Sequence, residues 1–199
     1  MGPTHIAVGV AASLVLAQPQ SAAACVAVAA GGLLGAAVCD VDAWSSANGR
    51  RVRTGALFVL AALAALAWAD VRLGSGVAAW LAANGGAANA LGLAAFAGTC
   101  ALAACTSHRS FAHSLTGLVL MTSALYLAVA PLAPWFAVGY ASHVALDLLN
   151  HRAVRLLYPL KRGFSAGLYK ADGVANAVFG AAGVAVCLVY TATLMAGAL

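Results

Sequence analysis

The chain has 199 residues, of which 64% are hydrophobic and only 8% are charged. Soluble domains carry about 25% charged residues, and here apolar runs recur along the whole chain, so the composition excludes an ordinary soluble enzyme and indicates a polytopic membrane protein. The formal charge of +5 does not indicate binding of nucleic acid, because the basic residues lie between the apolar runs, where membrane topology requires them.

Seven apolar segments, taken in chain order, predict membrane helices and leave little chain for a soluble domain. We expect an all-α fold, a polytopic membrane helix bundle of about six to seven membrane helices, in a single integral membrane domain over residues 1–199. The predicted helices cover residues 5–17, 22–39, 55–69, 76–104, 114–130, 134–150 and 173–198, the fourth with a break at "NGG", 84–86, as an alternative.

The first segment is short for a bilayer, which needs about 20 apolar residues. We expect a tilted or half-depth helix that ends before Pro19, since proline cannot continue a helix. The segment resembles a signal peptide but lacks a basic n-region, so we expect it to stay in the mature protein.

Alternating crossings place most polar loops on the same side of the membrane as the N-terminus. Nine of the ten lysines and arginines fall on this side and only Arg72 falls opposite, so the positive-inside rule makes this face cytoplasmic. The same face receives every histidine and four of the five carboxylates, namely His5, Asp40, Asp42, His108, His113, His143, Asp147, His151 and Asp172.

Two motifs place a polar pair close together. His143 and Asp147 in "SHVALDLLNHR" are four residues apart, so both can face one metal ion from one side of a helix; an intrahelical hydrogen bond between them is the alternative. In "DVD", Asp40 and Asp42 can face one ion from an extended or turn segment, or they cap the next helix or mark an interface.

The third motif, "HRSFAHS", has histidines five residues apart. In a continuous helix they would point about 140° apart, so His108 and His113 share a site only if the segment is not one helix. Ser110 is the predicted N-cap of the following helix, with His113 in its first turn. Arg109 would bind an anionic substrate or lipid headgroup, or else it snorkels to the interface.

Together, four segments deliver His and Asp side chains to one membrane face, and this mixed nitrogen and oxygen set suits zinc, manganese or iron. Ionisable residues within membrane segments indicate function. Two other classes stay open: a transporter for divalent metal or protons, which needs polar groups at several depths, and a non-catalytic membrane protein that binds a partner.

Four stretches also carry a resemblance: "THIAVG" at 4–9, "DVD" at 40–42, "HRSFAHSL" at 108–115 and "GYASHVALDLLNHRAVRLLYPLKRGFSAGLYKADGVAN" at 139–176. They resemble the YdjM-like family of LexA-binding, inner-membrane-associated metal-dependent hydrolases, which is similar to the zinc-dependent phospholipase C and P1 nuclease group. Cys39 stands where that family usually has proline. By position, the resemblance implies the metal ligands His5, Asp40, Asp42, His108, His113, His143 and Asp147.

The resemblance implies an integral protein of a bacterial or archaeal cytoplasmic membrane, and the distribution of basic residues predicts that its active face is cytoplasmic. We expect a metal-dependent hydrolase that cleaves a phosphoester of a membrane lipid or lipid-linked substrate, not of nucleic acid. One to three divalent ions would be held, zinc in the first place, with manganese or iron as alternatives. Asp42 or Asp147 would act as general base and Arg109 would balance the phosphate charge. The LexA-binding label of the family implies a cytosolic protein partner.

Overall fold

The computed structural model describes residues 2–42, 76–170 and 173–197, together with a few positions between 64 and 74. These residues form helices without a β-strand, in agreement with the predicted all-α class. The helices are α1 Gly2–Ala17, α2 Ala22–Val38, α5 Val77–Asn84, α6 Ala87–Ala104, α7 Leu115–Val129, α8 Ala133–Leu149 and α9 Val174–Met195, with 3-10 turns η1 Phe111–His113 and η2 Ala130–Leu132.

Of the two alternatives for residues 76–104, the break at "NGG" is the one present. α5 ends at Asn84, and α6 begins after Gly85 and Gly86. Most of the helix predicted for 55–69 and the basic positions 50, 51 and 53 lie outside the described residues, as does residue 172.

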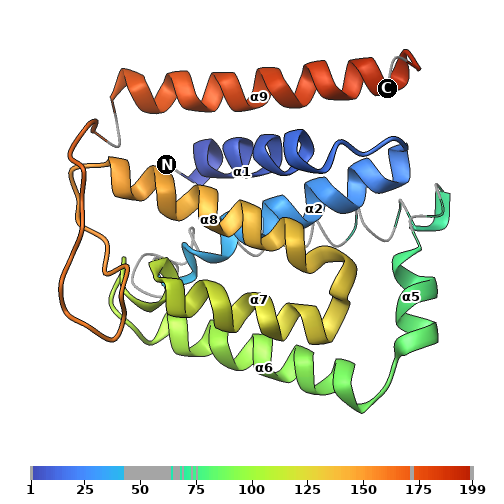
Figure 1. The fold of residues 1–199 in the computed structure, drawn as a ribbon, viewed down its shortest axis with the longest axis horizontal. Coiled ribbons are helices and arrows are strands. Elements are labelled where there is room, and N and C mark those ends of the chain that lie inside the picture. Colours follow the sequence, from blue (N-terminus) through green and yellow to red (C-terminus); the bar gives the residue numbers. More distant parts are fainter. Residues whose placement is uncertain are drawn as a thin grey trace.

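Three helical stretches among the described residues are long and apolar enough to cross a membrane: Ala87–Ala104, Leu115–Leu149 and Val174–Met195. α1 and α2, with 16 and 17 residues, are apolar but shorter. The second stretch contains two helices, α7 and α8, which lie side by side because the chain reverses its direction at η2 (Figure 1). These helices agree with a membrane protein, while six to seven crossings stay a prediction.

α2 packs against α8 through glycines. A Cβ atom at Gly35 would lie 2.0 Å from the carbonyl oxygen of Phe136, and one at Gly139 would lie 2.1 Å from that of Gly32. The two backbones therefore touch, as small residues allow between membrane helices. Because α2 and α8 run in the same direction (Figure 1), their C-terminal ends meet at one end of the bundle.

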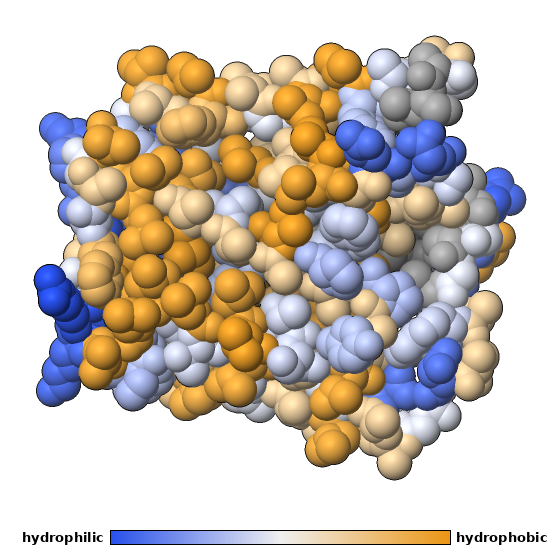
Figure 2. Space-filling view, in the orientation of Figure 1, coloured by the Kyte–Doolittle hydropathy of each residue, from blue (hydrophilic) through white to orange (hydrophobic). Residues whose placement is uncertain are grey.

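Residues 150–170, here called the strap, cross that same end of the bundle (Figure 1). Isolated bridges pair Val154 with Phe164 and Asn150 with Tyr169. The backbone N–H of Leu115 donates to the carbonyl of Leu156 at 2.9 Å, which fastens the strap to the start of α7. Hydrophilic residues gather along this edge, and apolar side chains cover much of the face beside it (Figure 2).

Candidate metal centre

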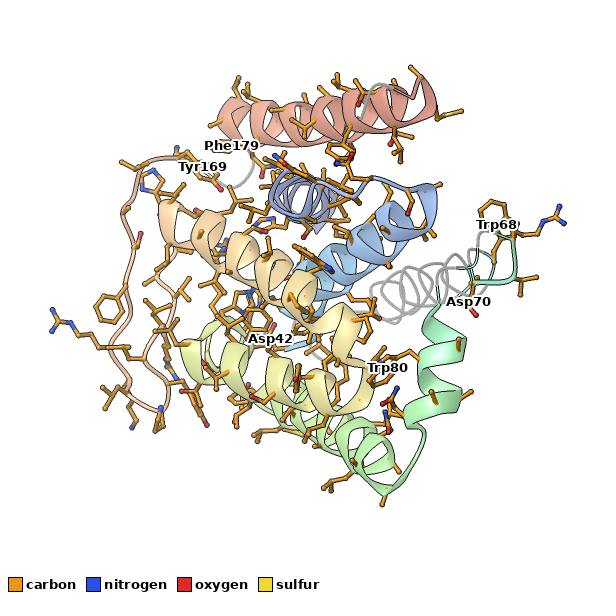
Figure 3. All side chains as sticks on the ribbon, turned by 45° about the vertical axis from the view of Figure 1, so that its right-hand side comes forward. Asp42, Trp68, Asp70, Trp80, Tyr169 and Phe179 are labelled. Atoms are coloured by element: carbon orange, nitrogen blue, oxygen red, sulfur yellow. The ribbon has the colours of Figure 1, made fainter. Side chains whose placement is uncertain are left out.

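The seven predicted ligands converge at the strap end of the bundle, because each lies near the same end of its own element. His5 lies in the first turns of α1, the two aspartates follow α2, two histidines lie between α6 and α7, and the last pair lies near the end of α8. Figure 3 shows Asp42 in the interior, and its exposed fraction is 1%. The converging residues are His5, Asp40, Asp42, His108, His113, His143 and Asp147.

Asp147 lies at the middle of one group. Its Oδ1 is 3.3 Å from Nε2 of His5, and its Oδ2 is 3.3 Å from Nε2 of His113 and 3.9 Å from Nε2 of His143. Two nitrogen or oxygen ligands of one tetrahedral zinc ion lie about 3.3 Å apart, since each is about 2.0–2.1 Å from the metal. Within this group His5, His143 and Asp147, all buried, offer donor atoms within 4.8 Å of one another. The spacing therefore fits ligands around one ion.

A second group lies beside it. Asp40, His108 and His113 also offer donor atoms within 4.8 Å of one another. Asp42 contacts both histidines of this group: its Oδ1 is 2.7 Å from Nδ1 of His108, and its Oδ2 is 3.5 Å from Nδ1 of His113. A carboxylate only accepts hydrogen bonds, so Nδ1 of His108 donates and Nε2 keeps a lone pair for a metal.

His143 is oriented by the main chain of α2. Its Nδ1 donates to the carbonyl oxygen of Ala36 at 2.7 Å, which leaves the lone pair on Nε2. That nitrogen is 3.9 Å from Oδ1 of Asp40 and from Oδ2 of Asp147. Metal-binding histidines commonly donate their other ring N–H to a backbone carbonyl in this way.

His113 is fully buried, with a carboxylate near each ring nitrogen. Neither nitrogen makes a well-aligned hydrogen bond in the described part of the chain. Burial by itself lowers the pKa of His113, but the carboxylates of Asp147 and Asp42 outweigh burial and raise its pKa to about 9. Burial by itself raises the pKa of Asp42, but the neighbouring rings of His108 and His113 outweigh burial and lower its pKa. A metal ion fits this arrangement, since it would replace the proton of His113 beside two anions.

Arg109 joins the two groups. Its backbone N–H donates to Oδ2 of Asp42 at 3.2 Å, and its side chain donates to Oδ1 of Asp147 at 2.8 Å and to the carbonyl of Arg152 at 2.6 Å. The residue has φ of 62°, a left-handed conformation uncommon for a side chain of this size. Arg109 is 7% exposed, and its guanidinium forms an ion pair with Asp147. Its contact with a substrate stays a prediction.

The predicted N-cap at Ser110 is wrong. Ser114 caps α7, accepting from the N–H of Gly117 at 3.0 Å, whereas Ser110 precedes the separate turn η1. We attribute the later start of α7 to the burial of Phe111, which is 1% exposed and lies in the core, in the turn before the helix. This break lets the rings of His108 and His113 lie 5.1 Å apart, as a shared site requires.

Two further features of the centre have no signal in the sequence. The contacts of Arg109 with both Asp42 and Asp147 depend on the strap and on η1, and the carbonyl of Ala36 is a main-chain group. His151, which the resemblance does not include among the ligands, is exposed on the strap.

Comparison with known proteins gives one result for nearly the whole chain. The family model described as YdjM inner membrane protein matches residues 1–198. No curated protein and no solved structure matches.

Proposed function

The chain belongs to the YdjM inner membrane protein family, and from that membership and its His/Asp centre we propose that it is a membrane-embedded metal-dependent hydrolase. Its substrate would be a phosphoester of a lipid or lipid-linked molecule. The observation that carries the proposal is the convergence of buried histidines and aspartates from four segments on one end of an apolar bundle.

The two ligand groups would each hold a divalent ion, with His113 near both. A bound ion would supply a water of lowered pKa, and hence a nucleophile near neutral pH. Asp42 and Asp147 are general-base candidates, but both are buried against His and Arg side chains. The side chain of Asp40 is 27% exposed, so Asp40 is the aspartate best placed to take a proton from entering water.

The surroundings of the centre support a phosphate-bearing lipid. Arg152, Lys161 and Arg162 are exposed on the strap at the same end of the bundle, where they would attract an anionic headgroup. The motifs resemble the YdjM-like family, and the similarity of that family to the zinc-dependent phospholipase C and P1 nuclease group is a further reason to propose phosphoester hydrolysis. Hydrolysis here would not require the acyl chains to leave the membrane.

The distribution of charge favours hydrolysis over transport. A transporter places polar binding groups near the middle of the bilayer, between interrupted helices. Here the His and Asp side chains of the centre gather at one end of the bundle, and the described carboxylate outside it, Asp70, lies far across the molecule from Asp42 (Figure 3).

Metal content measured by mass spectrometry tests the proposal. Detergent-purified protein should retain zinc, manganese or iron, and the double variant His143→Ala/Asp147→Ala should lose it. His151→Ala is the matched control, because this exposed strap histidine lies outside the centre. Metal-loaded protein should then release phosphate or a phosphorylated headgroup from a panel of phospholipids and lipid phosphates, and a chelator should stop it. Folded wild-type protein that binds none of zinc, manganese and iron would disprove the proposal. Metal-loaded protein that hydrolyses none of the phospholipids and lipid phosphates would disprove it as well.

A further inference from the structure

An apolar groove lies beside the metal centre, between α7, α8 and the strap. It has about 200 Å³ of free space, and nearly all of the lining surface is carbon. Its lining residues are Ser114, Leu115, Leu118, Ala141, Val144, Ala145, Leu148 and Leu156.

The groove and the centre use neighbouring faces of the same segments. Val144 and Leu148 line the groove and directly follow His143 and Asp147 in α8, and Ser114 directly follows His113. Consecutive residues of a helix point about 100° apart, so α8 presents its metal-binding residues to one side and groove residues to the next. Three residues of the groove lining are therefore direct chain neighbours of three residues of the centre.

The strap makes backbone hydrogen bonds both at the centre and at the groove. The N–H of Arg155 donates to the carbonyl of Arg109 at 2.9 Å, while the next residue, Leu156, lines the groove and accepts from Leu115. One short backbone segment, Arg155 and Leu156, thus bonds both to the Arg109 loop of the centre and to the first residue of α7, which lines the groove.

The surroundings of the groove suit a hydrocarbon chain. The stretch Leu115–Leu149 is apolar enough to cross a membrane, and Leu115 and Val119 of α7 are 46% and 61% exposed. On the strap, Leu157 and Leu160 are exposed beside the basic Lys161, a combination that suits the boundary between hydrocarbon and headgroups. A lipid would match both parts, with its chain in the groove and its anionic headgroup beside the basic strap.

We propose that this groove binds an acyl chain of a phospholipid and thereby places the phosphoester of that lipid at the His/Asp centre. The assignment of this lipid as substrate rests on the proposed hydrolase function. The groove would make the protein sensitive to the length and branching of the chain it accepts.

Photo-crosslinking tests the groove without depending on activity. The full chain is reconstituted in phosphatidylcholine vesicles that contain a trace of phosphatidic acid with a diazirine in one acyl chain, and the labelled peptides are mapped by mass spectrometry. Label should concentrate on residues 114–118 and 141–148. Ala145→Trp, at an exposed position of the lining, should lower this labelling about tenfold, as expected when roughly two methylenes leave an apolar site.

Ala185→Trp is the matched control, because Ala185 is an exposed alanine of α9 outside the groove lining, and it should label as wild type does. Label spread evenly over the exposed faces of α6, α7 and α9, or label unchanged by Ala145→Trp, overturns the groove. Metal content and hydrolysis of long-chain phosphatidic acid are measured on the same preparations. Slower hydrolysis in Ala145→Trp with its metal retained supports the substrate assignment, whereas groove-specific label without any metal-dependent hydrolysis keeps the acyl-chain site and rejects the hydrolase.

Discussion

His113 connects the two halves of the centre, because its Nε2 approaches Asp147 while its Nδ1 approaches Asp42. With its pKa raised to about 9, this imidazole carries a proton at neutral pH when no ion is bound. The protonated ring then compensates the buried carboxylates that a metal would otherwise neutralise. Proton and metal therefore compete for the same place.

This competition predicts that zinc binding releases at least one proton. Below about pH 9 the metal must displace the proton of His113, so the apparent affinity should rise with pH by about tenfold per unit between pH 7 and 9. Titration calorimetry in buffers of different ionisation enthalpy measures the protons released. His113→Asn should release fewer, while His151→Ala should match wild type. A pH-independent affinity would contradict this account of His113.

Arg109 bonds the same two carboxylates, through its backbone N–H to Asp42 and through its guanidinium to Asp147. Its pair with Asp147 is buried, with side chains 8% and 3% exposed, so removal of the guanidinium leaves a carboxylate short of positive charge. Loss of one partner from a buried pair costs about 3 kcal/mol or more of the free energy of unfolding.

Arg109→Ala should therefore lower the thermal unfolding temperature of the metal-free protein. Added zinc should recover part of the loss, because an ion would restore positive charge near Asp147. Arg152→Ala is the control: Arg109 bonds the main-chain carbonyl of Arg152, which this substitution keeps. Equal unfolding temperatures for Arg109→Ala and wild type would show that the pair contributes no stability.

At the scale of helices, the contact of α2 with α8 sets the position of the centre. Gly35 and Gly139 let these backbones touch, and this contact allows His143 to donate to the carbonyl of Ala36. The helix pair thus orients a metal-binding ring through main-chain geometry.

Gly35→Ala should separate the pair and weaken metal binding. The new Cβ would lie 2.0 Å from a backbone oxygen of α8, and such overpacking costs about 1–3 kcal/mol of the free energy of unfolding. Gly98→Ala is the control, since a Cβ there meets nothing within 4 Å, and it should leave both unfolding temperature and metal content at or above those of wild type. Full metal content in Gly35→Ala would show that the contact does not position the centre.

The ends of the helices were partly predictable from the sequence. α1 ends at Ala17 ahead of Pro19, and α5 ends at two glycines, because proline and glycine interrupt helices locally. The turn η1 was missed, because burial of Phe111 depends on residues far along the chain. For the centre, sorting polar residues by membrane side gave nine candidates, among them His151 and Asp172, and the family resemblance narrowed them to the seven that converge in the structure. Their pairings were not predictable, because they depend on how closely the helices approach.

At the scale of the whole molecule, the polar end of the bundle carries the centre, the groove and the basic strap together. Lys161 and Arg162 are exposed there, and the positive-inside rule predicts that this end faces the cytoplasm. Arg72, near the C-terminal side of the segment predicted for 55–69, is predicted to face the other side.

Labelling of introduced cysteines tests this orientation. In a variant without the five native cysteines, Arg162→Cys should react with a membrane-impermeant maleimide only after the membrane is opened, whereas Arg72→Cys should react in intact spheroplasts. Both substituted residues are exposed, so a difference in reaction reports side rather than burial. The reverse pattern would place the His/Asp centre on the outer face, where a substrate would have to come from the outer leaflet or the space beyond it. Reaction at both positions in intact spheroplasts would place both residues on the outer face and reject the predicted topology.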